Sequence, residues 1–124
     1  MLFNLDGKKI TSIPHKGDYN HWMKRLDSND YAKIVDELNR YIDNKIEKSE
    51  PVTSGWITGP DWDGTVFEPI YVACKGNQIQ AGYFFGLILF EIMMNRSEKW
   101  CCGKFSVDGR EIGSTTYFIS EGGI

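Results

Sequence analysis

Residues 77–95 read NQIQAGYFFGLILFEIMMN, and this stretch decides the fold. It is the most apolar run in the chain and holds a single charged residue, Glu91. A helix that is apolar on all sides is usually buried on all sides. We therefore predict a buried central helix near 77–95, with Asn77 as its N-cap. A carboxylate in such a helix must be paired, protonated or beside a polar cavity, which makes Glu91 a residue of interest.

Two glycines in this helix require an explanation. Gly82 and Gly86 are four residues apart and therefore share one face. Glycine in a helix interior costs about 1 kcal/mol relative to alanine. We expect another backbone of the same chain, from a helix or a sheet, to approach that face closely in compensation. Homodimerisation through the same face is the alternative.

Three more helices are predicted from the spacing of apolar residues and from capping residues. Residues 29–48 have apolar side chains at helical spacing and follow a run of N-cap residues, DSND. A two-turn apolar face predicts a helix over 19–26. Residues 68–74 form the third, because Pro69 suits a first helical turn and Gly76 suits a left-handed C-terminal cap.

Two Asp-Gly pairs, at 6–7 and 108–109, lie between segments that contain apolar residues. Such pairs favour tight turns, and they predict hairpins over 2–13 and 100–118. The chain is therefore predicted to be α+β, with a small antiparallel sheet from the N- and C-terminal hairpins packed against three to four helices. Its length suits a single globular domain spanning residues 1–124.

Composition narrows the classes of function. The 124 residues are 41% hydrophobic and 25% charged, with a net charge of −3 and no block of basic residues. We therefore expect no nucleic-acid partner. The longest uncharged run, 76–90, has 15 residues, fewer than the ~20 of a membrane-spanning helix. An odd number of cysteines, Cys74, Cys101 and Cys102, favours free thiols in a reducing compartment. We expect a soluble, cytoplasmic protein that does not bind a membrane.

The sequence Asp61-Trp62-Asp63-Gly64-Thr65-Val66 resembles the DxDGT nucleophile motif of haloacid-dehalogenase-like phosphatases. The resemblance implies that Asp61 is a nucleophile and Asp63 an acid/base, with Mg²⁺ between them. It covers six residues. The family places the motif after a buried strand, whereas Gly59-Pro60 precedes Asp61 here, and no adjacent acidic pair follows. A turn explains the same residues, because Asp bonds to backbone N–H groups and Gly accepts a positive φ.

The same loop also reads as a ligand-binding region. A short strand is expected over 52–58, and aromatic and acidic residues follow in a loop that leads into the helices. Aromatic planes beside carboxylates can hold a sugar, a cationic group or a partner's side chain. The predicted ligand-binding residues are Trp56, Asp61, Trp62, Asp63 and Glu68. The same tryptophans could instead close the end of a hydrophobic core.

The sequence thus favours a small soluble binding or interaction domain with no identifiable catalytic constellation, cofactor or metal. Its partner would be a small molecule or a protein, and homodimerisation stays open. The alternative is a small metal-dependent, phosphatase-like hydrolase that uses Asp61 and Asp63.

Overall fold

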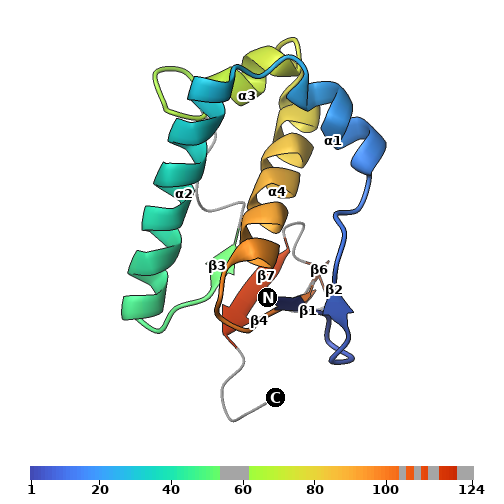
Figure 1. The fold of residues 1–124 in the computed structure, drawn as a ribbon, viewed down its shortest axis with the longest axis vertical. Helices are drawn as coiled ribbons and strands as arrows, with labels where there is room; N and C mark the ends of the chain where they lie inside the picture. The colour runs from blue at the N-terminus through green and yellow to red at the C-terminus, as the bar shows by residue number, and fades with distance from the viewer. Residues whose placement is uncertain (54–61, 104–105, 108–109, 112–114, 120–124) are drawn as a thin grey trace.

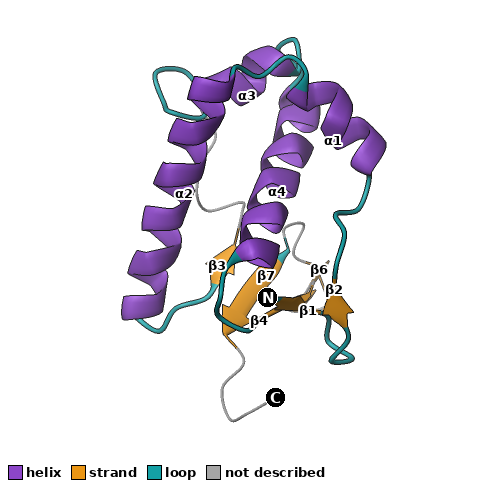
Figure 2. Cartoon of the chain, viewed as in Figure 1, coloured by secondary structure: helices purple, strands orange, loops and turns teal. Residues whose placement is uncertain are grey.

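The computed structural model describes residues 1–53, 62–103, 106–107, 110–111 and 115–119. Its helices form one layer that stands on a small sheet (Figures 1 and 2). The helices are α1 (Lys16–Met23), α2 (Ser28–Glu47), α3 (Glu68–Ala73) and α4 (Gln78–Asn95). The strands are β1 (Leu2–Phe3), β2 (Lys9–Ile10), β3 (Val52–Thr53), β4 (Trp100–Gly103), β5 (Ser106–Val107), β6 (Arg110–Glu111) and β7 (Thr116–Ile119). The predicted α+β class is confirmed.

Both predicted hairpins contribute strands to a five-stranded sheet with the order β2-β1-β4-β7-β3. β1 pairs antiparallel with β2, and β4 pairs antiparallel with β7. Where the two hairpins join, β1 and β4 run parallel, so the sheet is mixed rather than wholly antiparallel. A parallel pair needs a long crossover connection, and the four helices between β1 and β4 provide it.

The first hairpin has shorter strands than the sequence predicts. Each strand has two residues, because the Asn4 side chain organises a wider loop. Its Oδ1 accepts hydrogen bonds from the backbone N–H groups of Asp6 (3.0 Å) and Lys8 (2.9 Å). In the second hairpin, β5 and β6 form a separate pair with Val107 opposite Arg110, and the predicted turn at 108–109 lies outside the described residues.

α4 is the core helix that the sequence predicts. It begins after Asn77, whose side chain accepts a hydrogen bond from the Gln80 backbone N–H at 3.1 Å. Eight of its residues are buried: Ala81, Phe84, Phe85, Leu87, Ile88, Leu89, Ile92 and Met93. Glu91 is half-buried and accepts a hydrogen bond from the Tyr31 hydroxyl of α2 at 3.0 Å. The one carboxylate of α4 is therefore paired, and it joins two helices.

Contrary to the prediction, no backbone of the described residues covers the glycine face of α4. A Cβ atom added at Gly82 or Gly86 would meet no atom of these residues within 4 Å. The burial pattern explains this result, because the buried residues of α4 leave one side of its first two turns uncovered. The glycine face lies on that side.

The other helices agree with the sequence in position, with one shift. α2 is capped by Asp27, whose side chain accepts from the Asn29 N–H at 2.7 Å. α3 has the expected proline in its first turn, and Gly76 has the expected positive φ, 75°. α1 begins at Lys16, about a turn earlier than the predicted 19–26, directly after His15, which adopts a left-handed conformation (φ 52°), and it ends at Met23.

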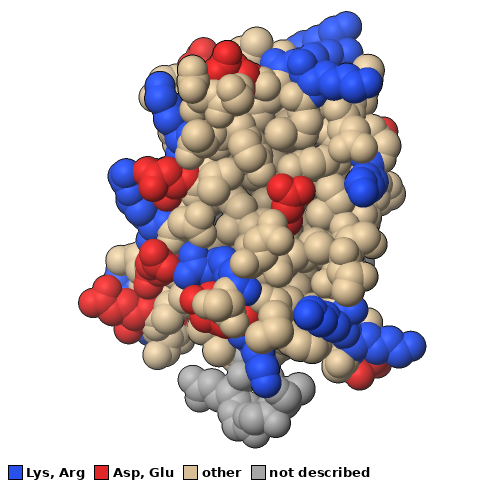
Figure 3. All heavy atoms as spheres, in the orientation of Figure 1, with Lys and Arg blue, Asp and Glu red and all other residues tan. Residues whose placement is uncertain are grey.

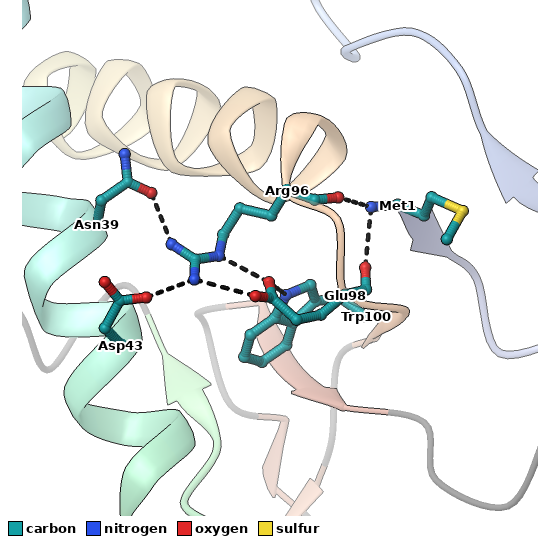
Figure 4. Close-up of polar contacts among 6 residues, drawn as sticks. All are labelled: Met1, Asn39, Asp43, Arg96, Glu98 and Trp100. Carbon is teal, nitrogen blue, oxygen red and sulfur yellow. Dashed lines mark hydrogen bonds and ion pairs between the residues drawn. The ribbon is translucent and has the colours of Figure 1, made fainter.

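A polar cluster that the sequence did not predict joins α2, α4 and the sheet (Figure 4). The Arg96 guanidinium donates hydrogen bonds to Asn39 (2.7 Å) and Asp43 (2.5 Å) of α2 and to Glu98 (2.8 and 3.2 Å). Glu98 also accepts from the indole N–H of Trp100, at 3.0 Å. The backbone nitrogen of Met1 donates to the carbonyls of residues 96 and 98. We call this cluster the Arg96 junction: Met1, Asn39, Asp43, Arg96, Glu98 and Trp100.

Candidate functional site

The candidate site is a cleft at the end of the helical layer farthest from the sheet, where α3 lies (Figure 1). We call this end the distal end and the cleft the distal cleft. The cleft has a volume of about 410 Å³ and lies between the α1–α2 turn and the start of α3. It is lined by Arg25, Leu26, Asp27, Asp30, Thr65, Glu68, Pro69 and Val72.

Local hydrogen bonds hold the wall that the α1–α2 turn provides. Asp27 uses one carboxylate oxygen to cap α2, which fixes that side chain at the mouth of the helix. The Arg25 guanidinium donates to the Ala73 carbonyl at 3.2 Å and to the His21 ring nitrogen Nε2 at 3.0 Å. Arg25 therefore ties the turn to the far end of α3, and its donors are partly used within the protein.

The opposite wall is a compact turn that leads into α3. The Thr65 hydroxyl donates to the Trp62 carbonyl at 2.9 Å and accepts from the Phe67 N–H at 3.2 Å. The Glu68 carboxylate reaches back across the turn and accepts a hydrogen bond from the Gly64 N–H at 2.8 Å. Gly64 has a φ of 72°, which explains glycine at this position. The turn places Glu68 with one carboxylate oxygen committed to the backbone.

The cleft combines negative charge with apolar surface. Three carboxylates line it, from Asp27, Asp30 and Glu68, against one cation, Arg25. Its apolar lining is formed by Leu26, Pro69 and Val72, and Val72 is 65% exposed. A large aliphatic side chain that exposed can be covered by a partner. Chemically, the cleft suits a cationic group that is flanked by apolar surface.

The structure describes three of the five residues that the sequence nominates, and they take different positions. Glu68 lines the cleft, and Asp63 is exposed in the turn before α3. Trp62 is 7% exposed; its ring stacks on Tyr71 with centroids 6.3 Å apart and meets Phe85 edge-on at 6.2 Å. Trp62 therefore supports the cleft wall from the core side. Trp56 and Asp61 lie outside the described residues.

Sequence reasoning missed Arg25, Asp30 and Val72 as members of this site. The run DSND was interpreted only as a helix start, and the two carboxylates also face the cleft. One signal for the cleft was present in the sequence, because acidic residues lie at the start of both α2 and α3. These residues share a surface if the starts of the two helices lie side by side. The meeting of the two helix starts is long-range, like the bond from Arg25 to Ala73, 48 residues away, and no local pattern reveals it.

Other reactive side chains have structural surroundings. Burial raises the pKa of the Cys74 thiol to about 11 and also raises the pKa of Cys102. Burial likewise raises the pKa of Tyr31, whose hydroxyl bonds to Glu91. Within the described ranges, no three His, Cys, Asp or Glu side chains are grouped so that they could hold a metal ion.

Comparisons of the chain with known protein families, with curated proteins and with solved structures gave no match. In the part of the chain that the structure describes, no helix combines the length and apolar character needed to cross a bilayer.

Proposed function

We propose that this chain is a non-enzymatic binding domain and that the distal cleft holds a partner segment in which a lysine or arginine lies beside apolar side chains. The observation that carries the proposal is the lining of the cleft, with three carboxylates, one engaged arginine and exposed Val72. A partner's cation would meet Asp30 and Glu68, and its apolar neighbours would cover Val72.

The chemistry sets an expectation for affinity. Exposed ion pairs contribute about 0–1 kcal/mol each, so the carboxylates direct the ligand more than they hold it. Covering one aliphatic side chain adds about 1.5 kcal/mol or more. A short ligand should therefore bind weakly, with a dissociation constant of several millimolar or more. A longer partner segment would gain affinity from the surface around the cleft.

The proposal can be tested by titrating ¹⁵N-labelled protein with a blocked Leu-Arg-Leu tripeptide and with the matched Leu-Glu-Leu tripeptide. The basic peptide should shift the backbone amides of Asp30, Thr65 and Val72, and the acidic peptide should leave them unchanged. Equal responses to the two peptides, or shifts that avoid these amides, would contradict the proposal.

Substitutions within the cleft sharpen the test. Asp30→Asn and Glu68→Gln should each weaken binding of the basic peptide about two- to fivefold, which corresponds to about 0.5–1 kcal/mol per exposed pair. Asp36→Asn is the matched control, because Asp36 lies on α2 in an exposed ion pair with Arg40, outside the cleft. If Asp36→Asn weakens binding of the basic peptide as much as the cleft variants do, the peptide is attracted only by the net charge of the protein.

The hydrolase alternative from the sequence, with Asp61 and Asp63, has its own outcome. Phosphatase screening with Mg²⁺ should give no turnover if the chain is a binding domain. Metal-dependent turnover that is lost in Asp61→Asn would overturn the proposal. A cytoplasmic location belongs to the same proposal, and it is supported by the three free thiols, which suit a reducing compartment. Homodimerisation concerns a different surface.

A further inference from the structure

The exposed side of α4 carries an alternation of large and small residues. Ile79 is 70% exposed and Tyr83 is 66% exposed, which is unusual for large apolar side chains. Gly82 and Gly86 lie on the same side, since the four positions fall within about 100° around a helix of 3.6 residues per turn. We call Ile79, Gly82, Tyr83 and Gly86 the α4 stripe.

Nothing in the described fold covers the α4 stripe. No atom of the described residues lies within 4 Å of a Cβ atom added at either glycine. Packing among these residues therefore does not recover the helix-propensity cost of the glycines, about 1 kcal/mol each. The surrounding sequence from Gly76 to Phe90 contains no charged residue, in a chain that is 25% charged. The stripe is thus an uncharged strip with two protruding side chains and two notches.

We infer that the α4 stripe binds a second copy of this chain, with the two α4 helices antiparallel about a twofold axis between positions 82 and 83. In this register residue 79 faces residue 86 of the other copy, and residue 82 faces residue 83. Ile79 and Tyr83 each then face a glycine of the other copy. Every large side chain enters a notch, and no large pair or small pair meets.

Charge and shape both favour a second copy over a different protein. A twofold interface brings each residue near its own image, so a charged strip would repel itself and an uncharged strip does not. The order large-small-large-small is complementary to its own reverse, which is the requirement of an isologous contact. Glycines let two helices approach closely and gain contacts between backbones. The stripe offers no charge that would select another partner.

The dimer should be weak and reversible. α4 has 18 residues and is about 27 Å long, and the stripe occupies only part of that length. One helix pair buries much less than the ~800 Å² per partner of a standard interface. Association should therefore appear as a rise of average mass with protein concentration rather than as a fixed dimer.

Sedimentation equilibrium of the full chain over a range up to about 1 mM tests the inference. This upper limit corresponds to about 4 kcal/mol of binding free energy. The wild type should show a monomer–dimer equilibrium. Gly82→Leu and Gly86→Leu fill the notches and should weaken association at least tenfold, although each variant should be more stable to urea because leucine favours helix. A wild type that stays monomeric over the whole range would overturn the inference.

Two further variants separate this interface from general stickiness. Gln80→Leu adds the same side chain to an exposed position of α4 outside the stripe and should leave the dissociation constant unchanged. Gly82→Tyr alone places two large side chains opposite each other and should weaken association. The double variant Gly82→Tyr with Tyr83→Gly again places a large side chain opposite a small one, and it should recover most of the lost affinity between the two copies. The proposed register would be contradicted if the double variant recovered no affinity, or if Gln80→Leu weakened association as much as the glycine substitutions do.

The test is independent of the distal cleft. Asp30→Asn, which weakens the proposed peptide binding, should leave the dimer unaffected, and Gly86→Leu should leave peptide binding unaffected. Each proposal can therefore fail without the other.

Discussion

The two ends of α4 contrast in how completely the fold covers them. At the sheet end, the helix runs into the Arg96 junction, where Arg96, Glu98 and Trp100 are joined by hydrogen bonds and Trp100 is fully buried. At the distal end, Ile79 and Tyr83 of the same helix extend into solvent above open space at Gly82. One helix thus has a closed end and an end with one open side, opposite the buried Ala81, Phe84 and Phe85; we call these the closed end and the open end.

The contrast indicates that different parts of this domain provide its stability and its binding surfaces. The closed end joins both helices and the sheet and should carry a large share of the folding free energy. The distal end of the domain carries both the exposed residues of α4 and the distal cleft, and this is where we place binding. Figure 3 shows that much of the middle of the displayed face is uncharged, apart from acidic atoms near its centre. Substitutions at the two ends should therefore have different effects.

The largest difference should come from aromatic residues at the two ends. Trp100→Ala should lower the free energy of unfolding by about 4 kcal/mol, because it opens a cavity and removes the indole donor to Glu98. Tyr83→Ala should change it by less than about 0.5 kcal/mol, since the ring is mostly in solvent. Urea unfolding in dilute solution measures both. Similar losses would remove the distinction between the ends.

Two arginines give the next largest effect. Arg96 and Arg40 both bond to two carboxylates, but their side chains are 14% and 71% exposed. Arg96→Met should cost about 2 kcal/mol of unfolding free energy, because charge-assisted hydrogen bonds in a sheltered site are lost. Arg40→Met should cost less than about 1 kcal/mol. An Arg96 variant as stable as the Arg40 variant would show that the junction contributes little.

At the open end, glycine substitution should stabilise. Gly82→Ala should raise the free energy of unfolding of the monomer by up to about 1 kcal/mol, because the added methyl group meets no atom of the described residues and alanine favours helix. Gly76→Ala, at a φ of 75°, is the control and should destabilise by about 1 kcal/mol. Urea titrations at low protein concentration compare them. A destabilised Gly82→Ala would mean that another part of the chain covers this face.

The smallest effect concerns the pH dependence of the junction. Hydrogen bonding to Arg96 holds the pKa of the Glu98 carboxyl below its usual value. A lowered pKa stabilises the fold above the unfolded value of about 4.3, and that stability is lost as pH falls through the folded pKa. Glu98→Gln should therefore be less stable than wild type at neutral pH, with the gap closing below about pH 4. Urea unfolding midpoints of both proteins, measured across this pH range, test the prediction. A difference in midpoint that stays constant with pH would contradict it.

The sequence predicted the helices and turns better than the long-range contacts between them. The apolar run at 77–95, the cap at Asn77 and the turn at Gly76 are local signals, and the structure has them. The Arg96 junction and the distal cleft depend on contacts over roughly 50 residues, such as Arg96 with Asp43 and Arg25 with Ala73, which no local pattern encodes. Glu68 was found because it lies beside a distinctive loop, whereas Asp30 was hidden within a capping run.

The glycine prediction failed for a specific reason. The spacing of Gly82 and Gly86 shows that they share one face of α4, and their low helix propensity shows that they destabilise the helix. Neither property says which side of α4 the other helices occupy. The structure places that face on the uncovered side. The same spacing then indicates a contact outside the chain.

The most direct test of the closed and open ends uses the three isoleucines of α4. In protein labelled at isoleucine methyl groups, a soluble paramagnetic reagent should relax Ile79 strongly in dilute solution and leave Ile88 and Ile92 protected, since Ile79 is 70% exposed and the others are buried. As protein concentration rises, Ile79 alone should gain protection through the second copy. Protection of Ile79 equal to that of Ile88 in dilute solution would contradict the account.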